Sequence, residues 1–157
     1  MIVKASQRAL GQDLATHLLN ALDNEYVEVA ELRGTVARDL HGAFAEWEAC
    51  AGAVTRCKNY LYSLSVNPDP AQGPLTREQY YAFIDRAEER LGLAGQGRIV
   101  AFHIKDGREH YHVVWSRIDT VKGKAIHQAF DHEKLMLVAR QFAREQGLER
   151  SEERRVG

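Results

Sequence analysis

The stretch that decides the fold is RIVAFHIKDGREHYHVVWSRID, residues 98–119. It consists of two apolar runs, rich in β-branched and aromatic residues, on either side of Asp106-Gly107. An Asp-Gly pair suits the two central positions of a type I′ turn, where both residues take a positive φ. The stretch therefore predicts a β-hairpin.

The register of this hairpin decides whether three histidines share a face. With Asp106-Gly107 as a two-residue loop, His103 lies opposite His110, and the period of two along a strand adds His112 to the same face. A four-residue loop would also keep the three together, whereas a three-residue loop would turn His103 away. Cross-strand Cβ atoms lie about 5 Å apart and diagonal ones about 7–8 Å. Three imidazoles can therefore reach one divalent ion.

Three neutral imidazoles would leave coordination positions open, as catalytic metal sites do. Imidazole favours manganese, zinc, nickel or copper over magnesium, so these ligands alone do not name the ion. The alternative interpretation is that His110 and His112 are polar residues on a solvent-facing strand and that His103 belongs to the core.

Around the hairpin, the spacing of apolar residues alternates between strand and helix patterns. It predicts strands at 1–6, 26–32 and 59–66, and helices at 7–22, 36–53 and 131–147. A further helix follows Thr76, which has the capping-box spacing to Gln79, and ends at Gly92; residues 123–129 form a possible short strand. This order predicts an α+β fold with a mainly antiparallel central sheet, covered by helices mostly on one face.

Length and composition indicate one globular domain. The chain has 157 residues, of which 45% are hydrophobic and 27% charged, which excludes the disordered and collagen-like classes. We expect residues 1–148 to form the domain and 149–157 to be a charged, disordered tail. The opening MIVKAS lacks the apolar segment of a signal peptide, and no apolar run approaches membrane-spanning length. These features predict a cytoplasmic protein without a membrane partner.

The net charge of -1 argues against nucleic-acid binding, but it is an average over segments of different charge. Bases outnumber acids between residues 96 and 124, around the hairpin, so a locally positive face remains possible. The two cysteines, Cys50 and Cys57, are too few for a disulfide framework, and we expect both to be reduced and half-buried.

Two segments resemble motifs of the relaxase and mobilisation nuclease family, which are HUH endonucleases. The hairpin is similar to the family's third motif, a first His followed by His-x-His and then Asn-Arg, here Ser116-Arg117. NYLYSLSVNPDP, residues 59–70, resembles the second motif, a Ser-rich strand before a helix, and carries Ser63 and Ser65. The resemblance covers about residues 1–147. It implies a sheet-centred palm of the RRM/ferredoxin-like type and nicking of single-stranded DNA with covalent attachment to the 5′ phosphate.

The resemblance also implies one Mg²⁺ or Mn²⁺ ion, single-stranded DNA of a transfer origin as substrate, and accessory mobilisation proteins as possible partners. Ser116 replaces the family's Asn beside the metal, and Lys105 stands where many relatives have an Asp that orients the first His. We expect DNA contacts from two serines of the second motif and three bases at or after the hairpin: Ser63, Ser65, Arg117, Lys122 and Lys124.

The nucleophile is where the sequence departs most from the family. Most relatives place a Tyr near the end of the first helix, and the matching segment here, DLATHLLN, has His17. Histidine can attack phosphorus covalently. Tyr26, the nearest tyrosine, is the second candidate, although its Tyr-Val-Glu-Val context favours a structural role in a strand. Two other functions stay open: a binding module that grips single-stranded DNA without cutting it, and a hydrolytic phosphodiesterase using the same three histidines.

Overall fold

The computed structural model describes residues 1–20 and 25–147. One antiparallel sheet of five strands, in the order β1-β3-β5-β4-β2, forms its middle layer. The strands are β1 (Ile2–Arg8), β2 (Tyr26–Arg33), β3 (Leu61–Asn67), β4 (Arg98–Lys105) and β5 (Arg108–Ser116). A separate short ladder joins β6 (Ile118–Asp119) and β7 (Lys124–Ala125). The predicted α+β class with an antiparallel central sheet is confirmed.

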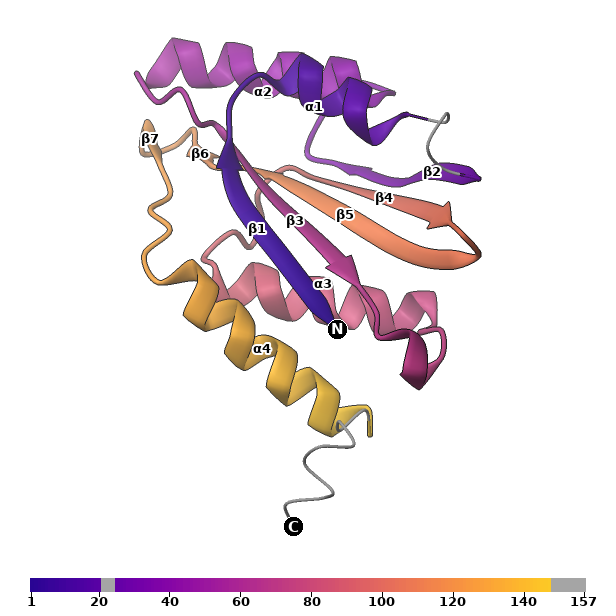
Figure 1. The fold of residues 1–157 in the computed structure, drawn as a ribbon. Helices are drawn as coiled ribbons and strands as arrows, with labels where there is room; N and C mark the ends of the chain where they lie inside the picture. Colours follow the sequence, from indigo (N-terminus) through magenta and orange to yellow (C-terminus); the bar gives the residue numbers. More distant parts are fainter. Residues whose placement is uncertain (21–24, 148–157) are drawn as a thin grey trace.

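Helices cover both faces of this sheet (Figure 1). On one face lie α1 (Gly11–Leu18) and α2 (Leu40–Val54); on the other lie α3 (Arg77–Arg90) and α4 (Asp131–Glu145), with a 3₁₀ turn, η1 (Pro70–Gln72), before α3. The expectation that the helices lie mostly on one face was wrong. The central strands are apolar on both sides: in β5, Val113 and Trp115 join the core under α3 and α4, whereas Val114 joins the core under α1 and α2. Both faces therefore need a cover.

The local signals behind the elements are confirmed in most places. Asp106 and Gly107 have φ values of 53° and 72°, as a type I′ turn requires, and Thr76 forms a complete capping box with Gln79. The first helix begins at Gly11 rather than at residue 7, because β1 continues to Arg8 in its pairing with β3. The short strand expected at 123–129 is reduced to β7.

The remaining expectations concern the end of the first helix, the C-terminal tail, the two cysteines and the absence of a membrane-spanning segment. The predicted end of the first helix, at residues 21–22, and the predicted tail, 149–157, lie outside the described residues. Cys50 is exposed and Cys57 is half-buried, and both are free thiols. Among the helices described, none combines the length and the apolar character needed to cross a membrane.

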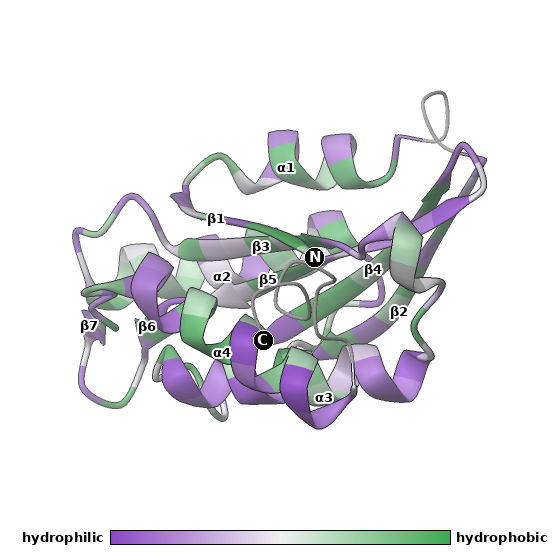
Figure 2. Cartoon of the chain, turned by 60° about the horizontal axis from the view of Figure 1, so that its bottom comes forward, coloured by the Kyte–Doolittle hydropathy of each residue, from purple (hydrophilic) through white to green (hydrophobic). Residues whose placement is uncertain are grey.

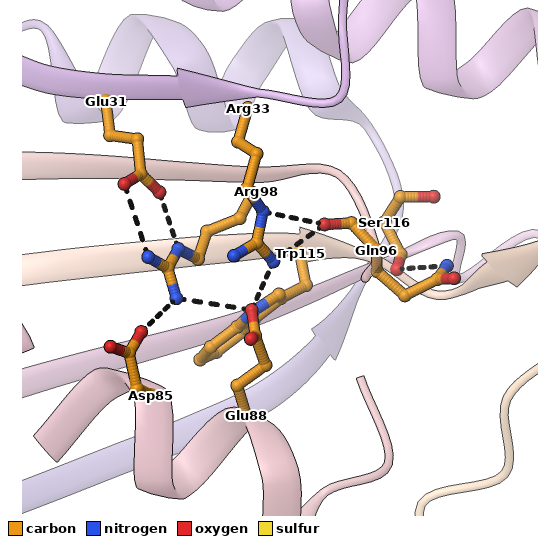
Figure 3. Close-up of polar contacts among 8 residues, drawn as sticks. All are labelled: Glu31, Arg33, Asp85, Glu88, Gln96, Arg98, Trp115 and Ser116. Carbon is orange, nitrogen blue, oxygen red and sulfur yellow. Dashed lines mark hydrogen bonds and ion pairs between the residues drawn. The ribbon is translucent and has the colours of Figure 1, made fainter. Parts of the chain in front are cut away.

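A cluster of polar side chains between α3 and the sheet connects the helix to the strands (Figure 3). In Figure 2, hydrophobic residues are frequent along the strands of the sheet, and hydrophilic residues are frequent along α3. Glu88, on the inner side of α3 and 8% exposed, accepts hydrogen bonds from Arg33, from Arg98 at 3.2 Å and from the Trp115 indole at 2.9 Å. One carboxylate thus joins α3 to three strands.

Candidate metal centre and the helix beside it

The two strands of the hairpin bring three histidine rings together. His103 pairs with His110, and the centroids of the His103, His110 and His112 rings lie 4.5–5.6 Å apart. One ring nitrogen from each residue can be chosen so that all three lie within 4.8 Å of one another. The predicted register and the common face of the three histidines are therefore confirmed.

The surroundings of this three-His cluster favour the neutral imidazoles that bind metals. His103 is 3% exposed and the other two are half-buried. Desolvation lowers the pKa of each ring, and for His112 desolvation, followed by the nearby charges of His103 and His110, lowers the pKa to about 3. At neutral pH each ring keeps a free nitrogen lone pair. The donor set therefore fits a divalent ion.

Helix α1 is fixed to the sheet at both ends. At its C-terminal end, the Leu18 carbonyl accepts a hydrogen bond of 2.7 Å from His103 Nε2. At its N-terminal end, the Gly11 N–H donates to the Tyr60 hydroxyl at 3.0 Å, and a Cβ at position 11 would lie only 2.4 Å from that oxygen. Only glycine fits this approach. Leu14 and Leu18 are buried between these contacts, so the position of α1 over the sheet is well determined.

This arrangement places His17 next to the three-His cluster. His17 is an exposed residue in the last turn of α1, directly before Leu18. Its charge contributes to lowering the pKa of both His103 and His112, so the three rings are electrostatically coupled. The structure thus brings His17 near two of the three predicted metal ligands, His103 and His112.

Tyr26 is not brought to the cluster. Its neighbour Val27 is the residue of β2 that pairs with His103, so Tyr26 points to the opposite face of the sheet. There its hydroxyl donates to Glu28 at 2.5 Å, and Glu28 is also bound by Arg77 of α3. The hydrogen bond to Glu28 raises the pKa of Tyr26, which makes the phenol a poorer nucleophile.

Comparison with known proteins found a match to a family model. A family model described as "Relaxase: MobA/VirD2-like, nuclease domain" matches residues 17–148. The chain belongs to this relaxase family. The match begins at His17 and spans the hairpin with all three clustered histidines. No curated protein and no solved structure matches the chain. DNA nicking in mobilisation, with a divalent metal, is the activity of the family.

The two serines of the relaxase's second motif lie on the same face as the three-His cluster. Ser65 of β3 pairs directly with His112, and Ser63 is two residues away on the same side of the strand. Both are half-buried, in contrast to Val66 and Leu64, which point into the opposite core. Both serines therefore stay candidates for DNA contacts beside the cluster.

Arg117 has a different place from the one expected. It is 5% exposed, and its guanidinium donates to the carbonyls of Asn59 at 2.7 Å and Ile126 at 2.9 Å. These bonds join the segment before β3 to the segment after β7. Because this buried guanidinium already donates to two backbone carbonyls, we leave Arg117 out of the proposed DNA interface.

Ser116 also lies away from the three-His cluster. It is four residues beyond His112 along β5, roughly 13 Å at the rise of a β-strand. Its hydroxyl accepts a 3.3 Å hydrogen bond from the Ile118 N–H, so it holds the end of β5 instead of a metal ligand. Lys122 and Lys124 are exposed around β7, farther along the chain in the same direction, and remain candidates for remote phosphate contacts.

Sequence reasoning missed the contribution of β1. Val3 and Ala5 pack against the core under α3 and α4, so the alternating residues Lys4, Ser6 and Arg8 face the side of the three-His cluster, and all three are exposed. Lys4 pairs with Ser65, which pairs with His112 in turn. The alternation in MIVKASQR was visible, but only the pairing of β1 with β3 reveals its distance from the histidines.

Acidification should destabilise the metal-free relaxase domain through the histidine cluster. Folding lowers the pKa of His112 from 6.5 to about 3 because burial disfavours the cation. The unfolded chain therefore takes up protons first, and this contribution to stability, complete above pH 6.5, is lost as the pH falls toward 3. Urea unfolding at pH 7 and pH 4.5, without metal, measures it. His112→Asn should show a smaller loss of stability than the wild type; equal losses would contradict the prediction.

Proposed function

We propose that this relaxase nicks single-stranded DNA of a transfer origin with a divalent ion held by His103, His110 and His112, and that His17 receives the 5′ phosphate. The observation that carries the proposal is the position of His17, on a helix bonded to one of the three metal ligands. Accessory mobilisation proteins are proposed as further partners at the origin.

The proposed ion is Mg²⁺ or Mn²⁺, as in the family, and the all-imidazole donor set favours Mn²⁺ of the two. Bound among the histidines, it would polarise the scissile phosphate and neutralise the charge that develops there in the transition state. The protein's own part is to hold three neutral rings in one place. Burial keeps the three rings neutral, and the hairpin register puts them on the same face.

In the proposed covalent step, a ring nitrogen of His17 attacks the phosphorus and the bond between phosphorus and the 3′ oxygen breaks. The imidazole gives up its remaining N–H proton as the departing 3′ oxygen takes one up. The product is a phosphoramidate between His17 and the 5′ end of the DNA, with a free 3′ hydroxyl. A nucleophile must approach within about 3–3.5 Å of the phosphorus, and the exposed position of His17 leaves its ring free to do so.

We propose that the DNA strand crosses β1 and β3 before it reaches the metal. Lys4, Ser65 and His112 lie in one cross-strand row, which places the backbones of Lys4 and His112 about 10 Å apart. The next row contains Ser6 and Ser63. An ammonium group and several hydroxyls suit phosphate contacts without base recognition, so this polar strip is the proposed path of the backbone.

The chemical stability of the DNA adduct tests the nucleophile. A labelled single-stranded oligonucleotide that contains the nick site, incubated with the protein and Mn²⁺, should give a band shifted by the mass of the protein on a denaturing gel. Because a histidine phosphoramidate is acid-labile and base-stable, mild acid should release the DNA. His17→Ala should form no adduct, and the control Tyr26→Phe should form as much as the wild type.

Each other result of this experiment would indicate either a different nucleophile or a different function. An acid-stable adduct that persists in His17→Ala and disappears in Tyr26→Phe would transfer the role to Tyr26. Free cut ends without an adduct would indicate a hydrolytic phosphodiesterase. An intact oligonucleotide that still binds under native conditions would indicate a binding module.

A further inference from the structure

We propose that His103 has two roles at once: its Nε2–H holds the C-terminus of α1 at the Leu18 carbonyl, and its Nδ1 is the nitrogen left for the ion. His103 is then the positioning residue that makes metal binding and the placement of His17 one event. This inference deepens the proposed function and rests on it for the presence of the ion.

The tautomer of His103 follows from its partner. A carbonyl oxygen only accepts hydrogen bonds, so the 2.7 Å contact between Nε2 and the Leu18 oxygen requires the proton on Nε2. In a neutral ring the other nitrogen, Nδ1, then carries the lone pair. A nitrogen that holds a proton cannot bind a metal, so Nδ1 is the atom of His103 available to the ion.

The Leu18 carbonyl needs a hydrogen-bond donor from outside α1. It belongs to the last turn of the helix, whose carbonyls have no partner within the helix. The N–H of His103 fills this need from β4, and it places a polarised donor at the negative end of the helix dipole. His103 is 3% exposed, so no water competes strongly for the bond.

The hydrogen bond from His103 to the Leu18 carbonyl replaces the bond to a carboxylate that this chain lacks at position 105. A metal-bound imidazole usually donates its other N–H to a carboxylate or a carbonyl, which fixes the ring and raises its basicity. Lys105, two residues after His103, is exposed at the hairpin turn and offers no such acceptor. The backbone of α1 supplies it, so the ring orientation of one metal ligand depends on the helix that carries His17.

Coupling between ion and helix is the expected consequence. An ion on Nδ1 withdraws electron density from the ring and strengthens the Nε2–H donor, which tightens the bond to Leu18. Loading the site should therefore stabilise the last turn of α1, next to His17. In the other direction, a loosened α1 should weaken metal binding.

Nitrogen-15 NMR of the histidine rings of the whole protein tests the tautomer directly, with zinc as a diamagnetic probe. Without metal, His103 should show a protonated Nε2 and a bare Nδ1; with zinc, Nδ1 should show the shift of a metal-bound nitrogen while Nε2 keeps its proton. A His103→Asn spectrum identifies the signals. A proton on Nδ1, or zinc on Nε2, would overturn the proposal.

The same spectra separate this inference from the proposed function. If zinc moves none of the three rings, the metal site itself is wrong, and the ligand role of Nδ1 is wrong with it. The tautomer in the metal-free spectrum still decides whether His103 caps α1. Loss of nicking in an activity assay would not make this distinction.

Amide hydrogen exchange provides a second readout with a matched control. His103→Ala and His110→Ala each remove one imidazole from the cluster, but of the two only His103 bonds to the described part of α1. Exchange of the last α1 amides should become about fivefold faster in His103→Ala, the equivalent of one hydrogen bond, and stay unchanged in His110→Ala. If the last α1 amides exchange at the same rate in the two variants, the proposal is overturned. If His103→Ala does not fold, the wild-type NMR experiment still decides.

Discussion

Replacing His112 with alanine should reduce Mn²⁺-dependent cleavage of single-stranded DNA by about a thousandfold or more. The three ring centroids lie 4.5–5.6 Å apart in a triangle, and His112 pairs with Ser65, so its loss removes one of the three nitrogen donors. A bound metal ion contributes several kcal/mol of charge stabilisation to such a transition state, and each 1.4 kcal/mol or so is a factor of ten in rate. Cleavage of a labelled oligonucleotide, followed on a denaturing gel, measures the effect.

His127→Ala is the matched control for this variant. His127 is an exposed histidine between β7 and α4, outside the three-His cluster, and its removal should leave the rate unchanged. Binding of the uncut oligonucleotide should survive in His112→Ala, since Lys4, Ser63 and Ser65 remain. A His112→Ala protein that is folded and cuts at more than a tenth of the wild-type rate would show that the cluster is not the metal site.

Replacing Glu88 with alanine should lower the free energy of unfolding by about 3 kcal/mol, the lower end of the cost of removing one partner from a buried ion pair. Arg98, whose side chain is 5% exposed, would lose one of its carboxylates, and the buried Trp115 indole would lose its acceptor. Urea denaturation of the metal-free protein measures the change. Figure 3 shows the contacts of Glu88. They lie under α3 with Trp115, on the face of the sheet opposite His112, because Trp115 and His112 are three residues apart on β5.

The neighbouring residue on α3 gives the control. Glu89 is exposed, and Glu89→Ala should change stability by no more than about 0.5 kcal/mol. Because Glu88 lies across the sheet from the three-His cluster, Glu88→Ala should keep its cleavage activity at temperatures where it is folded. A loss below 1 kcal/mol would mean that Arg33 and Arg98 are adequately satisfied by Glu31, Asp85 and the Gln96 carbonyl.

The candidate site shows why some residues were predictable and others were not. The three histidines belong to one hairpin, and a turn of two residues with positive φ fixes their register without reference to the rest of the chain. Arg117 and Ser116 lie away from the three-His cluster in the structure, because a motif written along a sequence does not show how far an extended strand carries each residue from the histidines. A β-strand rises by more than 3 Å per residue, so a residue four positions beyond His112 already lies outside the candidate site.

The sequence by itself determined the hairpin, the capped helix at Thr76 and the shared face of His103, His110 and His112, because each depends on local backbone geometry and short-range spacing. Only the tertiary structure decided which face each helix covers, that β1 lies beside β3, and that the end of α1 bonds to His103. These features join residues far apart in the chain. Strands and helices with two apolar sides can pack in several ways, and the choice among them is made by how all the surfaces fit together at once.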